Sequence, residues 1–250
     1  MKSELTKPHA MHHSEHEMHT RLDPHQRSVS GLSDIILGGQ DGLVNVLGVI
    51  LGVAAATRDP GIVLVAGLAA TFAESVSMGA VAFTSTLADA DYYDSELERE
   101  MRHIEQVPKL EREEVRKIYA EKGFLGDMLE HIVDTITANP DVWVAVMMAE
   151  EHKLTPIDRK KAWKVALVVG LSAILGSIIP INPFIFLPVT SSMWVSVIIT
   201  ALVLFVVGWY KARMTVGHPG KSGFEMALIG TLSALVGYAV GVLLKVPTTP

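Results

Sequence analysis

The stretch TFAESVSMGAVAF, residues 71–83, decides the fold class of this 250-residue chain. It lies within residues 61–88, which are mostly apolar and contain no Lys, Arg or Asp. About 20 such residues in a helix are enough to cross the hydrocarbon core of a bilayer. The stretch therefore predicts a membrane-spanning helix, with the carboxylate of Glu74 inside it and Met78 one helical turn later.

Four further apolar segments have membrane-spanning length, which gives five predicted spans. The five cover residues 33–56, 61–88, 162–181, 184–209 and 224–244, and prolines stand at or near their ends. A mean hydropathy of +0.34, with 49% hydrophobic residues, also favours a polytopic membrane protein. We therefore expect an all-α protein with five transmembrane helices and a lipid bilayer as its surroundings.

Charge and cysteine content exclude several classes of protein and site. A net charge of −6 does not suggest a nucleic-acid partner, and the absence of cysteine excludes disulfides and thiolate metal sites. Of the 21 Lys and Arg residues, the predicted spans place only Arg58 and Lys245 on one side. The positive-inside rule then predicts a cytoplasmic N-terminus and a C-terminus outside. Without an organellar signal or cysteine, a prokaryotic plasma membrane is the expected location.

The second span is predicted to continue into the cytoplasm, because no proline follows Gly61 before Pro108. A helix of about 46 residues would be roughly 70 Å long, against a bilayer core of about 30 Å. Amphipathic helices should follow near residues 110–122, 126–138 and 141–153, with Asp141 as the N-cap of the last. Their expected buried residues are Leu110, Val115, Ile118, Met128, Ile132, Val133 and Ile136.

Polar and sulfur-containing residues in the first two spans are candidates for an ion path. Asp41 and Asn45 lie one turn apart in the first span, as do Glu74 and Met78 in the second. A charge in the middle of a bilayer costs roughly 2.5–3.5 kcal/mol on insertion scales, so it normally faces a cavity or a partner. Carboxylates combined with a thioether suit iron(II) and other transition metals. The alternatives are a helix-end aspartate and ordinary helix packing by the methionine.

The charged region after the second span holds a second group of candidate ligands. Glu100 and His103 form a Glu-x-x-His pair, and Glu96 lies one turn earlier on the same helix face. Paired motifs of this kind hold di-iron centres in ferritin-like bundles. The candidates on the following helices are Glu111, Glu114, Met147, Met148 and Glu151. The alternative is a solvated face with salt bridges to Arg99, Arg102 and Lys117.

Glycines recur at a spacing of four residues in the predicted spans, at positions 38 and 42, 48 and 52, and 237 and 241. Small residues at this spacing let membrane helices approach closely. The spacing fits either packing within one subunit or a seam between two subunits.

Four segments in this order resemble the vacuolar iron transporter family of plants, fungi, bacteria and archaea. They are DGLVNVLGVILGVAAA, AESVSMGAVAFTSTLADADYYDSELEREMRHIE, VWVAVMMAEE and GFEMALIGTLSALVGYAVG, and the resemblance covers about residues 30–246. It implies a five-span homodimer that moves iron(II), and often manganese(II), out of the cytoplasm in exchange for protons. The metals are then cargo and not cofactors.

The resemblance also implies roles for individual residues. Asp41 and Met78 match the aspartate and methionine of the family's translocation path, which the glutamate matching Glu74 lines. The residues that match the family's cytoplasmic metal ligands are Glu100, Glu111, Glu114, Glu151, Met147 and Met148. His103 departs from the pattern, because a further glutamate is expected there, and the imidazole removes one negative charge from the domain.

The sequence thus predicts an exporter of divalent transition metals and not an enzyme. The expected parts are a His-rich cytoplasmic tail (residues 1–32), spans one and two (33–90), a cytoplasmic helical metal-binding domain (91–158) and spans three to five (159–250). The tail, with six of the ten histidines, is either a metal-gathering segment or a biased flexible terminus. The alternatives are a membrane-anchored di-iron ferroxidase and a cytoplasmic domain that serves as a metal sensor or docking module.

Overall fold

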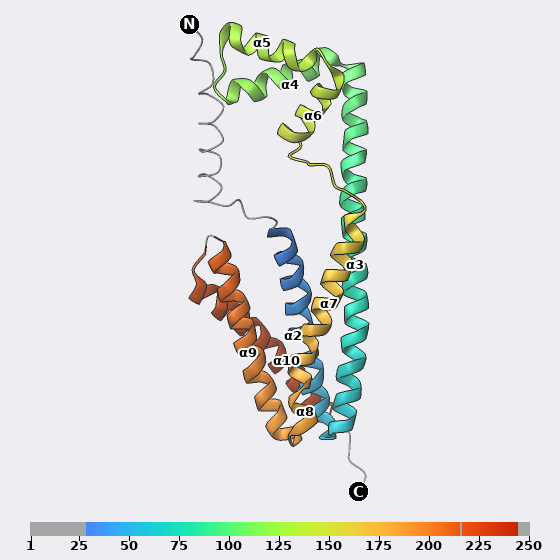
Figure 1. Cartoon of the computed structure of the whole chain (residues 1–250), viewed down its shortest axis with the longest axis vertical. Coiled ribbons are helices and arrows are strands. Elements are labelled where there is room, and N and C mark those ends of the chain that lie inside the picture. Colours follow the sequence, from blue (N-terminus) through green and yellow to red (C-terminus); the bar gives the residue numbers. More distant parts are fainter. Residues whose placement is uncertain (1–28, 216, 245–250) are drawn as a thin grey trace, which may run out of the picture.

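The computed structural model describes residues 29–215 and 217–244, and these residues form helices joined by short loops (Figure 1). The predictions for the histidines of residues 1–28 lie outside the described part. The helices are α2 (Val29–Thr57), α3 (Pro60–Gln106), α4 (Pro108–Glu121), α5 (Gly126–Thr137), α6 (Pro140–Glu150), α7 (Lys161–Ile181), α8 (Pro183–Phe186), α9 (Val189–Met214) and α10 (Pro219–Leu243). The predicted all-α class is confirmed, and α2, α3, α7 with α8, α9 and α10 are long and apolar enough to cross a membrane.

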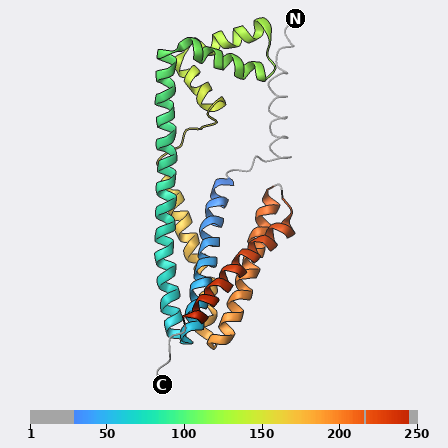
Figure 2. The same ribbon diagram turned by 180° about the vertical axis from the view of Figure 1, so that it is seen from behind.

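Helix α3 runs the whole height of the molecule and joins its two parts (Figures 1 and 2). It begins where the Asp59 side chain accepts hydrogen bonds from the backbone N–H groups of Gly61 and Ile62, with Pro60 in the first turn. It ends at Gln106, just before Pro108. Its 47 residues make a helix about 70 Å long, as predicted, and only half of that length fits within a bilayer core.

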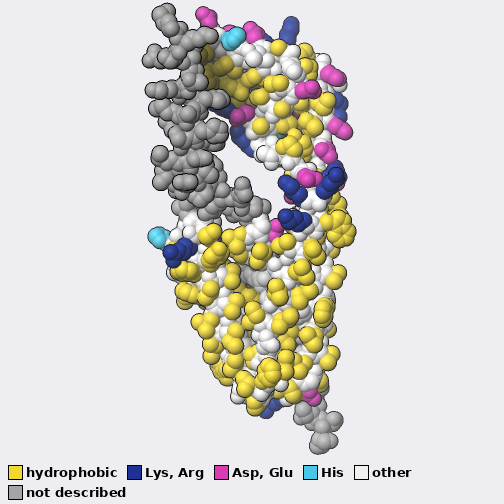
Figure 3. All heavy atoms as spheres, in the orientation of Figure 1, with side chains coloured by type: hydrophobic (Ala, Val, Ile, Leu, Met, Phe, Trp, Pro, Cys, Tyr) yellow, Lys and Arg dark blue, Asp and Glu magenta, His cyan; other side chains and the backbone are white. Residues whose placement is uncertain are grey.

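The lower part of the molecule is an apolar bundle with α2 at its centre. Helix α2 packs against α3, α7, α9 and α10, and its residues Val46, Leu47 and Ile50 are almost fully buried. The outward faces of the surrounding helices are also apolar, since Val76 and Leu175 are 73% and 69% exposed. Hydrophobic side chains accordingly cover this part of the surface in Figure 3. A bundle that is hydrophobic inside and outside is typical of helices surrounded by lipid.

The recurring glycines lie where two helix backbones meet. A Cβ atom built on Gly237 would lie 2.1 Å from the carbonyl oxygen of Gly48, and one on Gly241 would lie 2.0 Å from that of Gly52. Residues 38 and 42 approach the backbone of α7 in the same manner. Of the two possibilities left open by the sequence, these contacts therefore represent packing within one subunit.

Replacing Gly237 by Ala is expected to destabilise the bundle by about 1–3 kcal/mol, the usual cost of overpacking. The added methyl group would force α2 and α10 apart, because it would meet backbone that cannot rotate away. Thermal denaturation of the purified protein in detergent measures the change. Gly220→Ala is the matched control on the same helix, since a Cβ atom there meets nothing within 4 Å. Equal melting temperatures for the two variants would contradict the close contact.

We call the upper part of the molecule, residues 91–154, the head. It consists of the end of α3 with α4, α5 and α6 packed beside it (Figure 1). Val115, Val133, Met147 and Met148 form the centre of its hydrophobic core, and Trp143 lies next to them. Charged side chains are concentrated on the head and at its junction with the apolar bundle (Figure 3).

The predicted buried faces of the head are correct for five of the seven expected positions and wrong for two. Leu110 is 58% exposed and Met128 is 64% exposed. In each helix the buried stripe begins one residue later, at Glu111 in α4 and at Leu129 in α5. One residue corresponds to about 100° of rotation around a helix, which is enough to turn a side chain away from the core. The positions that do lie in or against the head core are Val115, Ile118, Ile132, Val133 and Ile136.

Three helix ends differ from the prediction. Asn139, and not Asp141, is the N-cap of α6, because its side chain accepts a hydrogen bond from the Asp141 backbone N–H at 2.9 Å. Helix α6 ends at Glu150 instead of continuing to residue 153. The fourth span begins at Val189 and not near residue 184, because Leu187 adopts an extended conformation before Pro188.

Candidate metal-binding sites

The first candidate site lies between α2 and α3 in the apolar bundle. The Asn45 side-chain amide donates a hydrogen bond of 2.8 Å to a carboxylate oxygen of Glu74. Asp41 lies one turn before Asn45, and its carboxyl also interacts with that of Glu74. Met78 is partly buried one turn further along α3. The structure thus brings Asp41, Asn45 and Glu74 together, with Met78 on the same side of α3.

This group offers two carboxylates, one amide and a nearby thioether within the apolar bundle. Two adjacent carboxylates repel each other when both are ionised, so a cation or a proton between them stabilises the pair. Oxygen and thioether ligands together suit a transition-metal ion such as iron(II). Asn45 is exposed on the surface of the bundle, so the group is open on the side between α2 and α3. Its assignment as a translocation path stays a prediction.

The second candidate site lies in the head and contains Glu100, Glu151 and His152. One ligand atom from each of these residues lies within 4.8 Å of the other two. The Nε2 atom of His152 is 3.2 Å from a carboxylate oxygen of Glu100. Glu100 comes from α3 and is 3% exposed, whereas the other two residues follow the end of α6. The fold therefore assembles this group from segments about 50 residues apart in sequence.

Two carboxylates of α4 extend the group in the head. Glu111 is 3% exposed, and its side chain lies 3.5 Å from Nδ1 of His103. Burial, followed by the neighbouring Glu100 and then Glu114, raises the pKa of Glu111 to about 8. Burial is also the main reason that the pKa of Glu151 is raised, and Glu114 adds to it. The four glutamates thus lie close enough to repel one another. We call them, with His103 and His152, the head cluster.

Two oxygen atoms of the head cluster have no hydrogen-bond partner among the described residues. They are Oε1 of Glu100 and Oε2 of Glu111, and both are buried. A buried carboxylate oxygen normally has a hydrogen-bond donor or a metal ion beside it, because its desolvation is otherwise uncompensated. The head cluster therefore lacks positive charge at its centre, and a divalent metal ion would supply it.

The remaining predicted ligands of the head have other neighbours. Glu96 is buried and accepts a hydrogen bond of 2.9 Å from Arg99, which is one of the salt bridges expected for a charged helix face. Met147 and Met148 are 0% and 1% exposed and pack in the hydrophobic core of the head. A thioether can fill a core and still bind a soft metal. Their role as metal ligands stays a prediction.

His152 is the functional candidate that the sequence reasoning left out of the site. Adjacent residues in a helix point about 100° apart, so the expected continuation of α6 would have separated His152 from Glu151. Helix α6 instead ends at Glu150, and Lys153 has a left-handed backbone with a φ of 57°. This tight turn allows both side chains to reach α3. A polar Glu-Glu-His-Lys sequence after an apolar helix was the available signal for a helix end.

An ion pair fixes the connection between the head cluster and α7. Arg159 contacts Asp91 and Asp94 of α3 at 2.6 Å each. The segment of residues 151–160, which begins with two members of the cluster, is thereby held against α3 at its far end. The positions of Glu151 and His152 are consequently restrained from both sides.

Comparison with known proteins shows that most of this chain resembles a known family. A family model described as the VIT family matches residues 32–242. A vacuolar iron transporter 1 of Arabidopsis thaliana is 32% identical over 231 residues, covering 90% of this chain and 92% of the relative. A vacuolar iron transporter 1 of Oryza sativa subsp. japonica is 31% identical over 226 residues, with 90% of each chain covered. A vacuolar iron transporter of Plasmodium falciparum is 29% identical over 244 residues, covering 92% and 89%.

Proposed function

The chain belongs to the VIT family, and from this we propose that it exports Fe²⁺, with Mn²⁺ as a further cargo, from the cytoplasm in exchange for protons. It is an integral membrane protein with five apolar helices. The observation that carries the proposal is the contact of Asp41, Asn45 and Glu74 between two of these helices. A carboxylate pair at that depth requires a cation or a proton, which is the property that an antiporter needs.

The proposed mechanism assigns different tasks to the two sites. The head cluster collects metal ions at the cytoplasmic side, where its buried and unpartnered carboxylate oxygens favour a divalent cation. In the bundle, Asp41 and Glu74 replace part of the water around the ion, and Met78 adds a soft ligand. When the ion leaves, a proton takes its place on the carboxyl pair. Metal and proton therefore compete for the same oxygens, and this competition couples their movements.

The proposed orientation places the head and the N-terminus in the cytoplasm and the C-terminus outside. It rests on the distribution of basic residues, because Arg58 is the only Lys or Arg of residues 29–215 and 217–244 at the end of the bundle away from the head. The expected prokaryotic plasma membrane stays a prediction, since the relatives above are named for the vacuole. A homodimer is proposed because Asn45 is exposed beside Glu74 on an apolar surface, where a second subunit would shield the polar group.

Proteoliposomes with an imposed pH gradient provide the direct test. Uptake of Fe²⁺, Mn²⁺, Co²⁺ and Zn²⁺ is measured together with the proton flux in the opposite direction. The proposal requires Fe²⁺ flux that depends on the gradient and proton movement that depends on the metal. Metal flux with no opposing proton movement would contradict antiport while leaving metal transport intact. The ferroxidase alternative predicts oxygen consumption on addition of Fe²⁺, which transport does not require.

Metal binding to the head cluster near pH 7 is expected to release about one proton per ion. The pKa of Glu111 of about 8 means that this carboxyl is mostly protonated at pH 7, and the metal displaces the proton. The release should decrease as the pH rises through 8, because the group is then already ionised. Titration calorimetry of the full chain in buffers of different ionisation enthalpy gives the number of protons.

Glu111→Gln is expected to remove most of this release. Glu121→Gln is the matched control, because Glu121 is exposed on the same helix and outside the cluster. Proton release that is unchanged between pH 6 and pH 9 would show that Glu111 is not the group displaced.

A further inference from the structure

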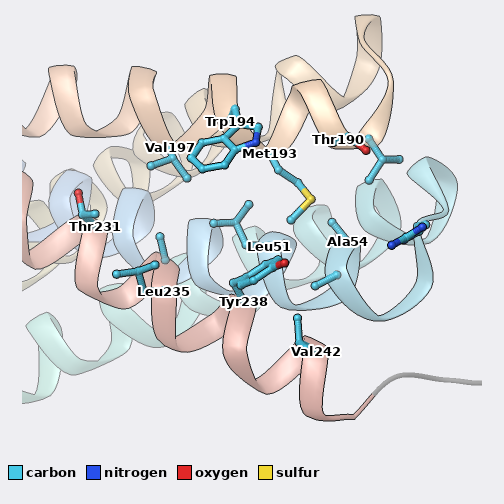
Figure 4. A pocket seen from close by; sticks show the side chains of 14 residues that line it. Leu51, Ala54, Thr190, Met193, Trp194, Val197, Thr231, Leu235, Tyr238 and Val242 are labelled. Carbon is cyan, nitrogen blue, oxygen red and sulfur yellow. The ribbon is translucent and has the colours of Figure 1, made fainter.

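A cavity of about 490 Å³ lies at the end of the bundle that is furthest from the head (Figure 4). It is formed by the last turns of α2, the first turns of α9 and the last turns of α10. None of the candidate metal ligands lines it. Its volume falls in the range of cavities that bind small molecules and cofactors. A ligand of this cavity would therefore be of a different kind from the metal cargo.

The walls of the cavity are mostly apolar, and one side opens onto the lipid-facing surface. In Figure 4, Trp194 and Met193 of α9 face Leu235 and Tyr238 of α10 across the cavity. Trp194 is 69% exposed and Tyr238 is 44% exposed, so these rings form a rim and not a closed wall. Aromatic residues of this type are common where a protein meets the membrane interface. A ligand can thus enter from the bilayer without passing through water.

The length of the cavity matches one leaflet of a membrane. Its lining on α10 runs from Thr231 to Val242, which corresponds to about 16 Å of helix. Half of a bilayer core is about 15 Å. One end lies beside the loop between α2 and α3, at the edge of the apolar bundle, and the other reaches the middle of α10. An extended hydrocarbon chain fits this shape better than a compact polar molecule does.

A single charged residue, Arg58, lines the cavity, and it stands at the outer end. Arg58 makes no ion pair within residues 29–215 and 217–244. The neighbouring carboxylate of Asp59 is already engaged with backbone N–H groups at the start of α3. A guanidinium group can bind two oxygens of one phosphate, which a lysine ammonium does less well.

We propose that this cavity is a binding site for an anionic phospholipid, with one acyl chain between α9 and α10 and the phosphate at Arg58. The apolar walls provide the larger share of the binding, since they remove an acyl chain from contact with neighbouring lipids and fill the space between two diverging helices. The charge of Arg58 selects the headgroup. The ligand is identified by the two features together: an apolar cavity as long as one membrane leaflet, and the guanidinium group of Arg58 at its outer end.

Lipid retention by the purified full chain tests this site. The protein is reconstituted with phosphatidylcholine and a minor fraction of phosphatidylglycerol and then extracted in mild detergent. Mass spectrometry of the intact complex reports which lipid remains bound. The wild type should retain phosphatidylglycerol with a preference of about five-fold, the effect of one basic residue near an anionic headgroup. Arg58→Gln should reduce that preference to near one, and Arg58→Lys should keep part of it.

Arg213→Gln is the matched control, because Arg213 stands at the opposite end of α9, over the ring of Trp209. It removes the same charge from the other end of the bundle and should leave the preference unchanged. An equal loss in both variants would overturn the site, because net charge would then explain the result. Displacement of the bound lipid by inorganic phosphate would also overturn it, since the acyl chain would then contribute nothing.

A second subunit is the competing occupant of the cavity. The chain has no cysteine, so Leu235→Cys introduces a single thiol on the cavity wall. Under oxidising conditions this variant should stay monomeric on a denaturing gel, because lipid separates position 235 from other protein. A disulfide-linked dimer, together with the absence of retained phosphatidylglycerol, would assign the cavity to a subunit interface and overturn the proposal.

Discussion

Asp41→Ala is expected to abolish proton-coupled Fe²⁺ transport in proteoliposomes while leaving the five-helix bundle folded. Asp41 and Glu74 interact across α2 and α3, and their oxygens are the hard ligands available to an ion at that depth. Removing one of the two should reduce the flux by about a hundredfold or more, which corresponds to roughly 3 kcal/mol of lost stabilisation of the ion. Met78→Ala removes the neighbouring thioether and is expected to abolish the flux as well.

The fold should survive these changes, because a carboxylate in an apolar bundle costs stability when no cation accompanies it. Size-exclusion profiles and melting curves in detergent check that the variants are intact. Asp34→Asn is the matched control, since Asp34 lies on the same helix near its first turn and away from Glu74. Normal transport by both Asp41→Ala and Met78→Ala would contradict the assignment of the path. Glu74→Gln separates charge from shape, because the new amide can still contact Asn45.

Glu100→Gln is expected to have two large effects of opposite sign in the head. It should weaken metal binding by about 10- to 100-fold, the range found when a group that supports a metal site is removed. It should also raise the stability of the metal-free protein by about 1–3 kcal/mol, because Oε1 of Glu100 is a buried carboxyl oxygen without a hydrogen-bond partner among the described residues. A residue with a purely structural role would lower stability when it is replaced, whatever the metal concentration.

Titration calorimetry with Mn²⁺ and thermal denaturation with and without the metal measure the two effects. Glu105→Gln is the control on the same helix, because Glu105 is exposed. Metal should raise the melting temperature of the wild type and of the control much more than that of Glu100→Gln. If Glu100→Gln instead melts at a lower temperature and binds Mn²⁺ as the wild type does, Glu100 belongs to the fold and not to the site.

Features that depend on local sequence were predicted well. The continuous helix α3 followed from the absence of proline between residues 61 and 107, and the five apolar segments followed from length and hydropathy. The close pairing of Asn45 with Glu74 was more difficult, because it depends on how α2 and α3 are placed side by side. The polar residues within two neighbouring apolar spans nevertheless indicated a shared site.

Features that depend on helix ends and on rotation around a helix could not be predicted. The Glu-x-x-His spacing suggested that Glu100 and His103 form one site on α3. In the structure, His103 instead contacts Glu111 of α4, and Glu100 contacts His152, which follows the end of α6. The exposure of Leu110 and Met128 has the same origin, since the choice between adjacent faces depends on tertiary packing. The cavity beside Arg58 left no pattern in the sequence, because three separate helices form it.

The length of α3 has a consequence for the kinetics of export. Glu74 and Glu100 are 26 positions apart on one continuous helix, which separates them by about 39 Å. An ion therefore cannot pass from one group to the other in a single step. In the proposed mechanism, the head then acts as a reservoir that raises the ion concentration near the membrane. Deletion of the head would then raise the metal concentration at which transport is half-maximal and leave the maximal transport rate unchanged.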